Sequence, residues 1–243
     1  RRVFSVPNPI FFIDCSQYLT SNRRRISPLL NRSPISCSSP EFDQEFSRAV
    51  KIDGFSEFNK TKKSRLARYK YTVKIDISRF YHAIYTHSIP WAMHGKIAAK
   101  ADRRKASPVV YGNMLDYLVR QGQDQQTIGI PVGPDISRII GELVSGARDK
   151  KFEETLGHMP EGARLIDDVY LGADTLEDAE EILSAYREAL KFFELDLNES
   201  KILAIHEHLV NHVNLVNQSY SESTGHRSFH TLHESTNITQ NTI

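Results

Sequence analysis

The stretch GARLIDDVYL, residues 162–171, places two adjacent aspartates between short apolar runs. Apolar residues on both sides of Asp167 and Asp168 fit two short strands, with the aspartates at or near the tip of a hairpin. A buried carboxylate is unfavourable unless it is paired or binds a cation. An isolated Asp-Asp pair is most often a turn or a helix cap. The meaning of this pair therefore depends on which other residues the fold brings beside it.

The composition is that of a globular protein, with 40% hydrophobic and 25% charged residues in a chain of 243. The length allows one or two domains. No apolar run approaches the roughly 18 residues of a membrane helix, and the start lacks a signal-peptide pattern, so we expect a cytoplasmic protein without a membrane partner. Two cysteines, Cys15 and Cys37, fit a reducing compartment. Because the first residue is Arg1, we expect a fragment or a processed product.

The charges are divided along the chain. Residues 1–74 contain 15 Lys and Arg against 6 Asp and Glu, whereas residues 160–199 contain 3 against 12. A basic N-terminal third indicates a polyanionic partner or, alternatively, a solvated face. The basic clusters at 23–25 and 60–68 favour nucleic acid.

The N-terminal third is predicted to be irregular. RRVFSV (1–6) alternates like a strand, a Pro-Asn-Pro turn follows, and residues 10–19 read as a helix. Residues 21–47 are polar and contain scattered Ser and Pro, so we expect mainly loop there. RYKYTVKIDI (68–77) alternates clearly and predicts a strand, with Asp76 on its polar face near the end.

The C-terminal two thirds are predicted to be mainly helical around the hairpin. Residues 88–123 read as helices with a polar interruption, and GIPVGPDIS (129–137) is a loop that leads into another helix. After the hairpin, Asp174 is expected to cap a helix with Glu177 completing a capping box. Leu176, Ala179, Ile182, Leu183, Tyr186, Leu190 and Phe193 are expected to form its buried side. LDLNESKILAI (195–205) reads as a turn and a last strand.

The three aspartates would belong to one site if the strand ending at Asp76 pairs with the hairpin that carries Asp167 and Asp168. Three carboxylates would then converge on one spot. Oxygen ligands of this kind suit Mg²⁺, which takes one or two protein carboxylates together with substrate phosphates. Two such ions about 3.5–4 Å apart stabilise the attacking and leaving oxygens of a phosphoryl transfer.

The spacing of these aspartates accompanies a set of motifs. The segments KIDISRFYHAIYTHSIPWAMHGK (74–96), QQTIGIPVGPDIS (125–137), RLIDDVYL (164–171) and LNESKI (197–202) occur in the order of polymerase palm motifs A, B, C and D. RRVFSVPNP (1–9) looks like the fingers motif of reverse transcriptases. As a set, over roughly residues 1–205, they resemble bacterial reverse transcriptases of the abortive-infection and defence-associated group.

This resemblance implies an α+β fold, a right-hand polymerase palm in which helices back an antiparallel sheet. It implies partial fingers at 1–70 and a palm at 71–205, with inserted helices at about 88–123. No thumb is recognisable. Residues 206–243 contain no Lys, Asp, Ala or Pro and keep no apolar period, so we expect a non-globular or out-of-frame tail.

The resemblance also assigns the catalytic residues. Asp76 and Asp167 correspond to the carboxylates that bridge two Mg²⁺ ions, and Asp168 to the accessory third; Mn²⁺ is open as a substitute. Lys201 stands where motif D carries a lysine that protonates the leaving pyrophosphate, although a solvated surface lysine is equally compatible with its position.

Substrate-binding residues follow from the same correspondence. Tyr81 falls where reverse transcriptases place an aromatic steric gate that selects dNTPs over NTPs. Small residues at Gly129, Pro131 and Gly133 match the motif B loop, where the backbone approaches template and nucleotide closely. The resemblance also assigns basic residues. Arg1 and Arg2 are expected to bind triphosphate oxygens. Lys74 is expected either to bind phosphate or to offset the charge of the carboxylates.

The implied function is that of an RNA-directed DNA polymerase, which adds dNTPs to a primer 3′-hydroxyl and serves in anti-phage defence. Its partners would be an RNA template and a DNA or protein primer, and a homo-oligomer is left open. Two departures concern motif detail: Leu165 stands where many reverse transcriptases have Tyr, and Ile128 precedes Gly129 in place of a Gln-Gly pair.

Several alternatives stay open at this point. The chain is alternatively a catalytically silent nucleic-acid-binding or assembly module, or a template-independent or protein-primed DNA polymerase. An RNA-dependent RNA polymerase shares the palm, but Tyr81 argues against it. An intron or retron enzyme would differ in genomic context.

Overall fold

The computed structural model describes residues 5–42, 50–199 and 203–206, the last four as backbone. The chain divides into two compact units, residues 1–205 and 206–243. Nearly all of the second unit lies outside the described residues, so the architecture given below is that of the first.

A four-stranded sheet lies at one end of this unit, with the strand order β4-β5-β3-β6. Both β3 and β4 run antiparallel to β5. A separate pair, β1 and β2, is also antiparallel. The bounds are β1 Glu41–Phe42, β2 Val50–Lys51, β3 Tyr71–Asp76, β4 Gly162–Leu165, β5 Asp168–Ala173 and β6 Leu203–His206.

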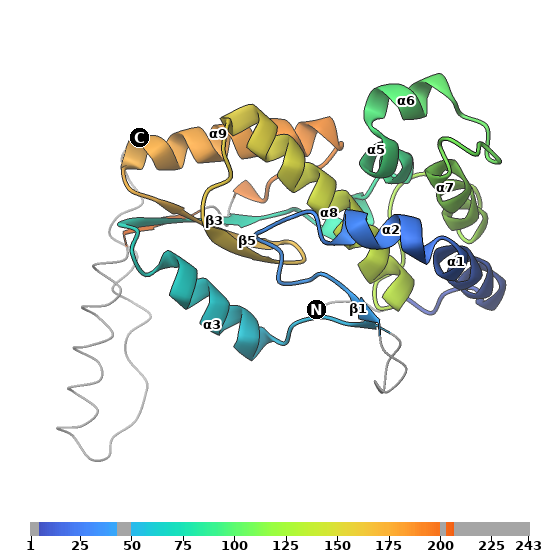
Figure 1. Ribbon diagram of the computed structural model, residues 1–243, viewed down its shortest axis with the longest axis horizontal. Helices are drawn as coiled ribbons and strands as arrows, with labels where there is room; N and C mark the ends of the chain where they lie inside the picture. The colour runs from blue at the N-terminus through green and yellow to red at the C-terminus, as the bar shows by residue number, and fades with distance from the viewer. Residues whose placement is uncertain (1–4, 43–49, 200–202, 207–243) are drawn as a thin grey trace, which may run out of the picture. The chain divides into compact units, whose positions relative to one another are not determined.

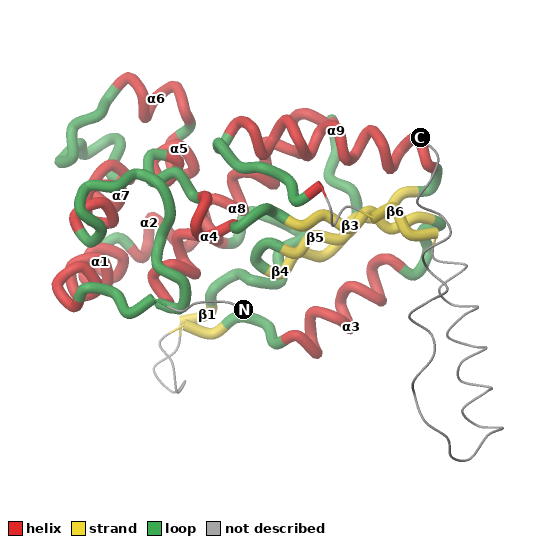
Figure 2. Tube along the Cα trace, turned by 180° about the vertical axis from the view of Figure 1, so that it is seen from behind, coloured by secondary structure: helices red, strands yellow, loops and turns green. Residues whose placement is uncertain are grey.

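The two faces of the sheet differ because side chains alternate along a strand. Val73, Ile75, Val169 and Leu171 point to one face and are at most 1% exposed. Helix α9 (Leu176–Phe192) packs on β3 and β5 there, and α8 packs on α9. The helices on this face and α3 on the other enclose the sheet in both views (Figures 1 and 2).

The opposite face is polar towards one end. Helix α3 (Phe55–Leu66) crosses β4 and β5 on this side. Phe58 is 1% exposed and packs with Ala163 and Tyr170, which forms a small second core under α3. The end of the face that carries Asp76 and Asp168 extends beyond this apolar cluster.

The remaining helices gather around α8, which is buried along most of its length. Their packing on α8, on α5 and on one another places the inserted helices beside the sheet rather than on it (Figure 2). The bounds are α1 Pro9–Ser21, α2 Arg23–Leu30, α4 Phe80–Ala83, α5 Ser88–His94, α6 Lys96–Ala101, α7 Gly112–Gln121 and α8 Asp135–Leu156.

Several predictions from the pattern are confirmed. Strand β3 falls within 68–77, and the hairpin β4-β5 holds the aspartates at its tip. Residues 88–123 contain three helices, and a last strand lies in 195–205 with one residue beyond it. Residues 1–4 of the expected first strand lie outside the described residues, and Ser5 and Val6 are not in a strand.

Two predictions of local structure are wrong. Residues 23–30 form helix α2 although loop was expected, because Ile26 and Leu30 lie four residues apart and are both buried. The capping box of α9 is shifted by one residue: Thr175 accepts from the Asp178 amide at 3.1 Å, and Asp178 accepts from the Thr175 amide at 3.0 Å.

The expected buried side of α9 also needs a correction. Leu176 is 53% exposed, because it begins the helix and lies outside the stripe that contacts the sheet. The stripe itself is confirmed at Ala179, Ile182, Tyr186 and Leu190. In the part of the chain that the structure describes, no helix combines the length and apolar character needed to span a bilayer.

Candidate functional site

Two of the three predicted carboxylates face each other across neighbouring strands. The register of β3 and β5 sets Asp76 directly opposite Asp168. Directly opposed residues of an antiparallel pair have Cα atoms about 4.5–5.5 Å apart. Asp76 is 8% exposed and Asp168 is half-buried. Two like charges placed this way repel each other.

The segment after α9 holds Asp76 in place. The Asn198 amide nitrogen Nδ2 donates to Oδ2 of Asp76 at 2.9 Å, and the Asn198 backbone N–H donates to the Asp76 carbonyl at 2.9 Å. An isolated antiparallel bridge joins Ile77 to Leu197. The beginning of LNESKI therefore lies beside the end of β3. Asn198 was not singled out from the sequence.

Asp167 lies in the turn that joins β4 to β5. Because Leu165 pairs with Asp168, only Ile166 and Asp167 form the loop. Two-residue hairpin loops favour turns whose first residue has a positive φ, which is usually Gly or Asn. Here Ile166 has a φ of 61°. A β-branched residue in this conformation costs about 1–3 kcal/mol and requires support from the surroundings.

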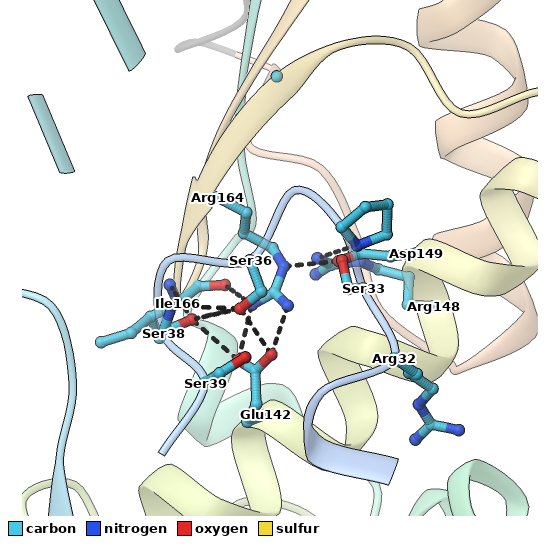
Figure 3. A network of polar contacts seen from close by, with 12 residues as sticks. Arg32, Ser33, Ser36, Ser38, Ser39, Glu142, Arg148, Asp149, Arg164 and Ile166 are labelled. Carbon is cyan, nitrogen blue, oxygen red and sulfur yellow. Dashed lines mark hydrogen bonds and ion pairs between the residues drawn. The ribbon is translucent and has the colours of Figure 1, made fainter. Parts of the chain in front are cut away.

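Support for the turn comes from Ser38 and Arg164. The Ile166 N–H donates to Ser38 Oγ at 3.1 Å, and Arg164 Nη1 reaches the Ile166 carbonyl at 3.4 Å. Arg164 also binds Glu142 on α8 through two hydrogen bonds, at 2.7 and 2.9 Å. Figure 3 shows these groups converging beneath the turn. Both backbone groups of the strained residue are thus tied to a buried polar network.

The network extends from the hairpin to α8 and to the segment 33–38. Arg164 Nε donates to Asp149 Oδ2 at 2.7 Å, and Arg148 Nη2 donates to Asp149 Oδ1 at 2.8 Å. Hydroxyls from the N-terminal segment complete it: Ser33 donates to Asp149 at 2.6 Å, and Ser36 and Ser38 donate to Glu142 at 2.7 and 2.8 Å (Figure 3). We call this set of residues (33, 36, 38, 142, 148, 149, 164) the Arg164 network.

Buried charges in the Arg164 network are balanced, with two arginines and two carboxylates. Arg164 and Asp149 are completely buried. Burial alone would lower the pKa of Arg164, but Asp149 and Glu142 raise it above its ordinary value. Burial would raise the pKa of Asp149, but Arg164 and Arg148 hold it below its ordinary value. Arg164 and Asp149 therefore stay ionised and paired with each other.

The backbone of segment 33–38 is also fixed to the hairpin. The Arg164 N–H donates to the Ile35 carbonyl and the Cys37 N–H donates to the Arg164 carbonyl, both at 2.7 Å. This pairing covers the outer edge of β4, which would otherwise expose unpaired backbone groups. A segment more than a hundred residues away in sequence thereby holds the turn that carries Asp167.

Tyr81 lies on α4, five residues beyond Asp76, and near the hairpin tip. It is half-buried, and it lines a small cavity together with Ile166, Ser38 and Gly141. A Cβ added at Gly141 would stand 3.3 Å from the Tyr81 ring. The Tyr81 ring thus lies between α8 and the β4-β5 turn, and Gly141 on α8 leaves room for it.

The loop before α8 contacts the segment that follows β3. The Gly129 and Ile130 N–H groups donate to the carbonyls of Ile84 and Tyr81, both at 2.8 Å. Gly129 has a φ of 88°, and a Cβ there would stand 3.2 Å from the His82 carbonyl. Gly133 also has a positive φ, and Pro131 is half-buried. The structure therefore places Gly129 beside segment 81–84, and Pro131 and Gly133 follow in the same loop.

Two lysines flank the carboxylates on the polar face. Lys74 pairs in register with Tyr170, and its Nζ lies 5.8 Å from the ring centroid. Lys62 on α3 lies over the same ring, at 4.2 Å. Burial and Lys74 lower the pKa of Lys62, whereas Asp168 opposes that shift. The sequence pattern does not single out Lys62, because it stands within the basic cluster at 60–68.

Three predicted site residues are not placed: Arg1, Arg2 and Lys201 lie outside the described residues. Within the described ranges, no group of three or more His, Cys, Asp or Glu side chains is arranged to hold a metal ion. A pair of carboxylates on adjacent strands is what the structure shows at this end of the sheet.

The Arg164 network was also missed. One signal was present: Glu142 interrupts the apolar stripe of α8 and is 3% exposed. Arg164 likewise stands between apolar residues in β4. Charged residues inside apolar stripes are rarely buried without partners, so each of them predicts a partner without identifying it.

The chain was compared with protein families, curated proteins and solved structures. No family model and no curated protein matches it. Among solved structures, the telomerase of Candida albicans in complex with a TWJ fragment of telomeric RNA is similar, with a TM-score of 0.48 and 11% identity over 78% of this chain and 34% of that one. The apo telomerase of Candida tropicalis, truncated from its C-terminal domain, gives 0.47 and 12% over 78% and 40%. The chain thus spans less than half the length of either telomerase chain.

Proposed function

We propose that this chain is the palm-containing part of an RNA-directed DNA polymerase, which transfers nucleotides from dNTPs to a primer 3′-hydroxyl. One observation carries the proposal: the residues of motifs A and C lie side by side, with Asp76 opposite Asp168 and Asp167 in the adjoining turn. The sequence motifs require this pairing, and strands that are more than 90 residues apart in sequence form it.

The donor chemistry of this pair fits Mg²⁺. Carboxylate oxygens are ligands of hard cations, and Mg²⁺ uses one or two of them while phosphates and water complete its octahedron. Asp76 and Asp167, with Asp168 beside them, are the residues that would hold it. When bound, Mg²⁺ stabilises negative charge on the transferred phosphoryl group and on the leaving pyrophosphate.

The chain's own groups supply the positioning. Asn198 orients the Asp76 carboxylate, and the Arg164 network orients the turn that carries Asp167. Lys62 and Lys74 place positive charge beside the carboxylates, where the triphosphate of a nucleotide would approach. Transfer of a phosphoryl group depends chiefly on such positioning and on charge stabilisation.

Sugar selection is assigned to Tyr81. Its ring lines the cavity next to the turn, and Gly141 fixes the space behind it. A ring at this place would stack under the incoming sugar and exclude a 2′-hydroxyl. The role in phage defence, and the roles of Arg1, Arg2 and Lys201, stay predictions from the motif resemblance.

Primer extension tests the proposal. The chain is supplied with oligo(dT) on poly(rA), dTTP and Mg²⁺, and compared with Asp76→Asn and Asp167→Asn. Because the carboxylates hold the ions, each variant is expected to lose at least about 10³-fold in rate, the equivalent of several kcal/mol. Asp174→Asn, an exposed aspartate beyond the opposite end of β5, is the matched control and should retain wild-type activity.

Equal rates in wild type and in both active-site variants would reject the two-metal proposal. Separate reactions without template, with a DNA template and with NTPs distinguish the alternatives. Incorporation that does not depend on template would support a template-independent enzyme. Tyr81→Ala should raise the ratio of NTP to dNTP incorporation, and an unchanged ratio would remove the steric-gate assignment.

A further inference from the structure

A second pocket lies among the inserted helices, apart from the aspartates. It has a volume of about 220 Å³ and opens between α5, α6 and α7. Tyr85, His87 and Trp91 form an aromatic wall, in which the Tyr85 ring centroid lies 4.9 Å from that of His87 and 5.5 Å from that of Trp91. We call this the α5–α7 pocket.

The floor of the α5–α7 pocket contains one carboxylate, which is paired with neighbouring side chains. Asp116 is 4% exposed, and it accepts from Arg120 Nε at 3.2 Å and lies 2.8 Å from His87 Nδ1. Burial would raise its pKa, but His87, Thr86 and Arg120 hold it below its ordinary value. The only carboxylate that lines the pocket thus has its charge compensated within the described structure.

The rim is strongly basic. Lys100, Arg103 and Lys105 are exposed, and among the residues that the structure describes none of these cations has a carboxylate within ion-pair distance. In contrast, the neighbouring Arg104 is bound through two hydrogen bonds by Asp102. Lys100 Nζ lies 5.5 Å from the Trp91 ring centroid and Lys105 Nζ 4.6 Å from that of Tyr117, while Arg103 Nε donates to the Lys100 carbonyl at 3.3 Å. Three cations at one opening, none of them neutralised by a carboxylate in the described ranges, attract an anion.

The loop that carries two of these cations is held in place. Ser107 Oγ donates to Asp102 at 2.7 Å, and Asn113 Nδ2 donates to the carbonyls of Asp102 and Arg104 at 2.7 and 3.1 Å. Because the loop is fixed to α7, Arg103 and Lys105 are presented to a ligand without a large ordering cost.

We propose that the α5–α7 pocket binds single-stranded nucleic acid, with one base against the aromatic wall and the flanking phosphates on the rim cations. Aromatic walls beside basic grooves are the chemistry that binds single strands. A volume of about 220 Å³ is below the roughly 300–1,000 Å³ of a site for a drug-sized ligand, so one planar ring fits. The rim cations lie on α6 and on the loop after it. They could therefore contact the phosphates of a nucleic-acid strand that continues beyond the pocket.

This binding requires neither metal nor the three aspartates, so it is measured apart from catalysis. The full chain carrying Asp76→Asn is titrated in EDTA against a fluorescent single-stranded oligo(U), at several salt concentrations. A rim variant combines Lys100→Glu, Arg103→Glu and Lys105→Glu. The matched control combines Lys70→Glu, Lys150→Glu and Lys191→Glu, three exposed lysines that do not line the pocket.

The rim variant is expected to weaken binding at least ten-fold and to reduce the slope of log K against log salt by about 2, because each lost phosphate contact contributes about 0.7. The control should stay within two-fold of the parent. Circular dichroism and melting curves confirm that both variants fold. Equal losses in the two variants, or no loss in the rim variant, would overturn the proposal.

The aromatic wall is tested separately. Tyr85→Leu removes the ring and is expected to weaken binding about ten-fold, whereas Tyr85→Phe keeps it and should bind like the parent. A 5-bromouridine strand should crosslink to residues 85–91, and crosslinks confined to other segments would contradict the assignment. A free mononucleotide and a duplex should both compete more weakly than the strand. Competition by the mononucleotide at the strand's own affinity would mean that the pocket binds nucleotides alone.

Discussion

The two faces of β3 and β5 are made by alternate residues of the same strands, yet their effects on stability are opposite. Towards α9, Val73, Ile75 and Leu171 are completely or almost completely buried and contribute apolar packing. On the other face Asp76 opposes Asp168, an arrangement that repels. The first face stabilises the fold, and the second uses part of that stability to hold charged groups close together. Functional sites commonly carry such a cost.

A third element, the Arg164 network, links the two faces. It is buried like the first face but is made of charges, and it supports the strained turn of the second. Its contribution to stability is therefore expected to depend on all its members at once. The three contributions should therefore differ in the size of their effects on stability.

The largest effect on stability is expected from Arg164→Met. Removing the guanidinium leaves Glu142 and Asp149 buried with less compensation, and breaking a buried pair costs about 3–5 kcal/mol. Chemical denaturation measures the free energy of unfolding. Arg187→Met is the matched control, because the Arg187–Glu199 pair at 2.9 Å is exposed and such pairs contribute about 1 kcal/mol or less. Similar losses in both variants would show that the network does not differ from a surface ion pair.

The apolar face is tested by Leu171→Ala. This side chain is 0% exposed, and truncating a buried leucine costs about 2–5 kcal/mol through lost burial and a cavity. The variant should keep its rate of nucleotide incorporation at a temperature where it is folded. Leu176→Ala, at a leucine that is 53% exposed, should change stability by less than about 0.5 kcal/mol. Loss of incorporation in folded Leu171→Ala would contradict the separation of the faces.

These two leucines also show what the sequence could predict. Strand β3 and the hairpin follow from apolar alternation, because each signal lies within a few neighbouring residues. The pairing of Asp76 with the Asp-Asp pair was expected only from the motif resemblance. Leu176 fits the apolar period of α9, but the period does not reveal that this side chain at the start of the helix is 53% exposed. Local pattern therefore predicts the elements better than it predicts their contacts.

The Arg164 network could not be predicted in this way. Ser36 and Glu142 are 106 residues apart, and Ser38 and Arg164 are 126 apart. Each residue alone has an ordinary local interpretation: a serine in a polar stretch, a glutamate on a helix, an arginine in a strand. Only the packing of segment 33–38 against β4 makes them one group.

The smallest effect is expected from the polar face. Asp168→Asn removes one of two opposed charges, so in EDTA the variant should be more stable than wild type by about 0.2–1 kcal/mol. Saturating Mg²⁺ with dTTP should stabilise wild type and reduce this difference. Asp174→Asn should show neither change. A destabilised Asp168→Asn variant would show that the carboxylate contributes to the fold rather than imposing a cost on it.

The most direct measurement is cleavage of the backbone by Fe²⁺ that replaces Mg²⁺. With dTTP, ascorbate and peroxide, hydroxyl radicals form at the bound ion and cut the nearest chain segments, which mass spectrometry of the fragments identifies. If one cation site is shared by the end of β3 and the hairpin turn, cuts appear together near Asp76 and near Asp167, and both disappear in Asp76→Asn but not in Asp174→Asn. Cuts at only one of the two segments, or cuts that persist in Asp76→Asn, would contradict the account.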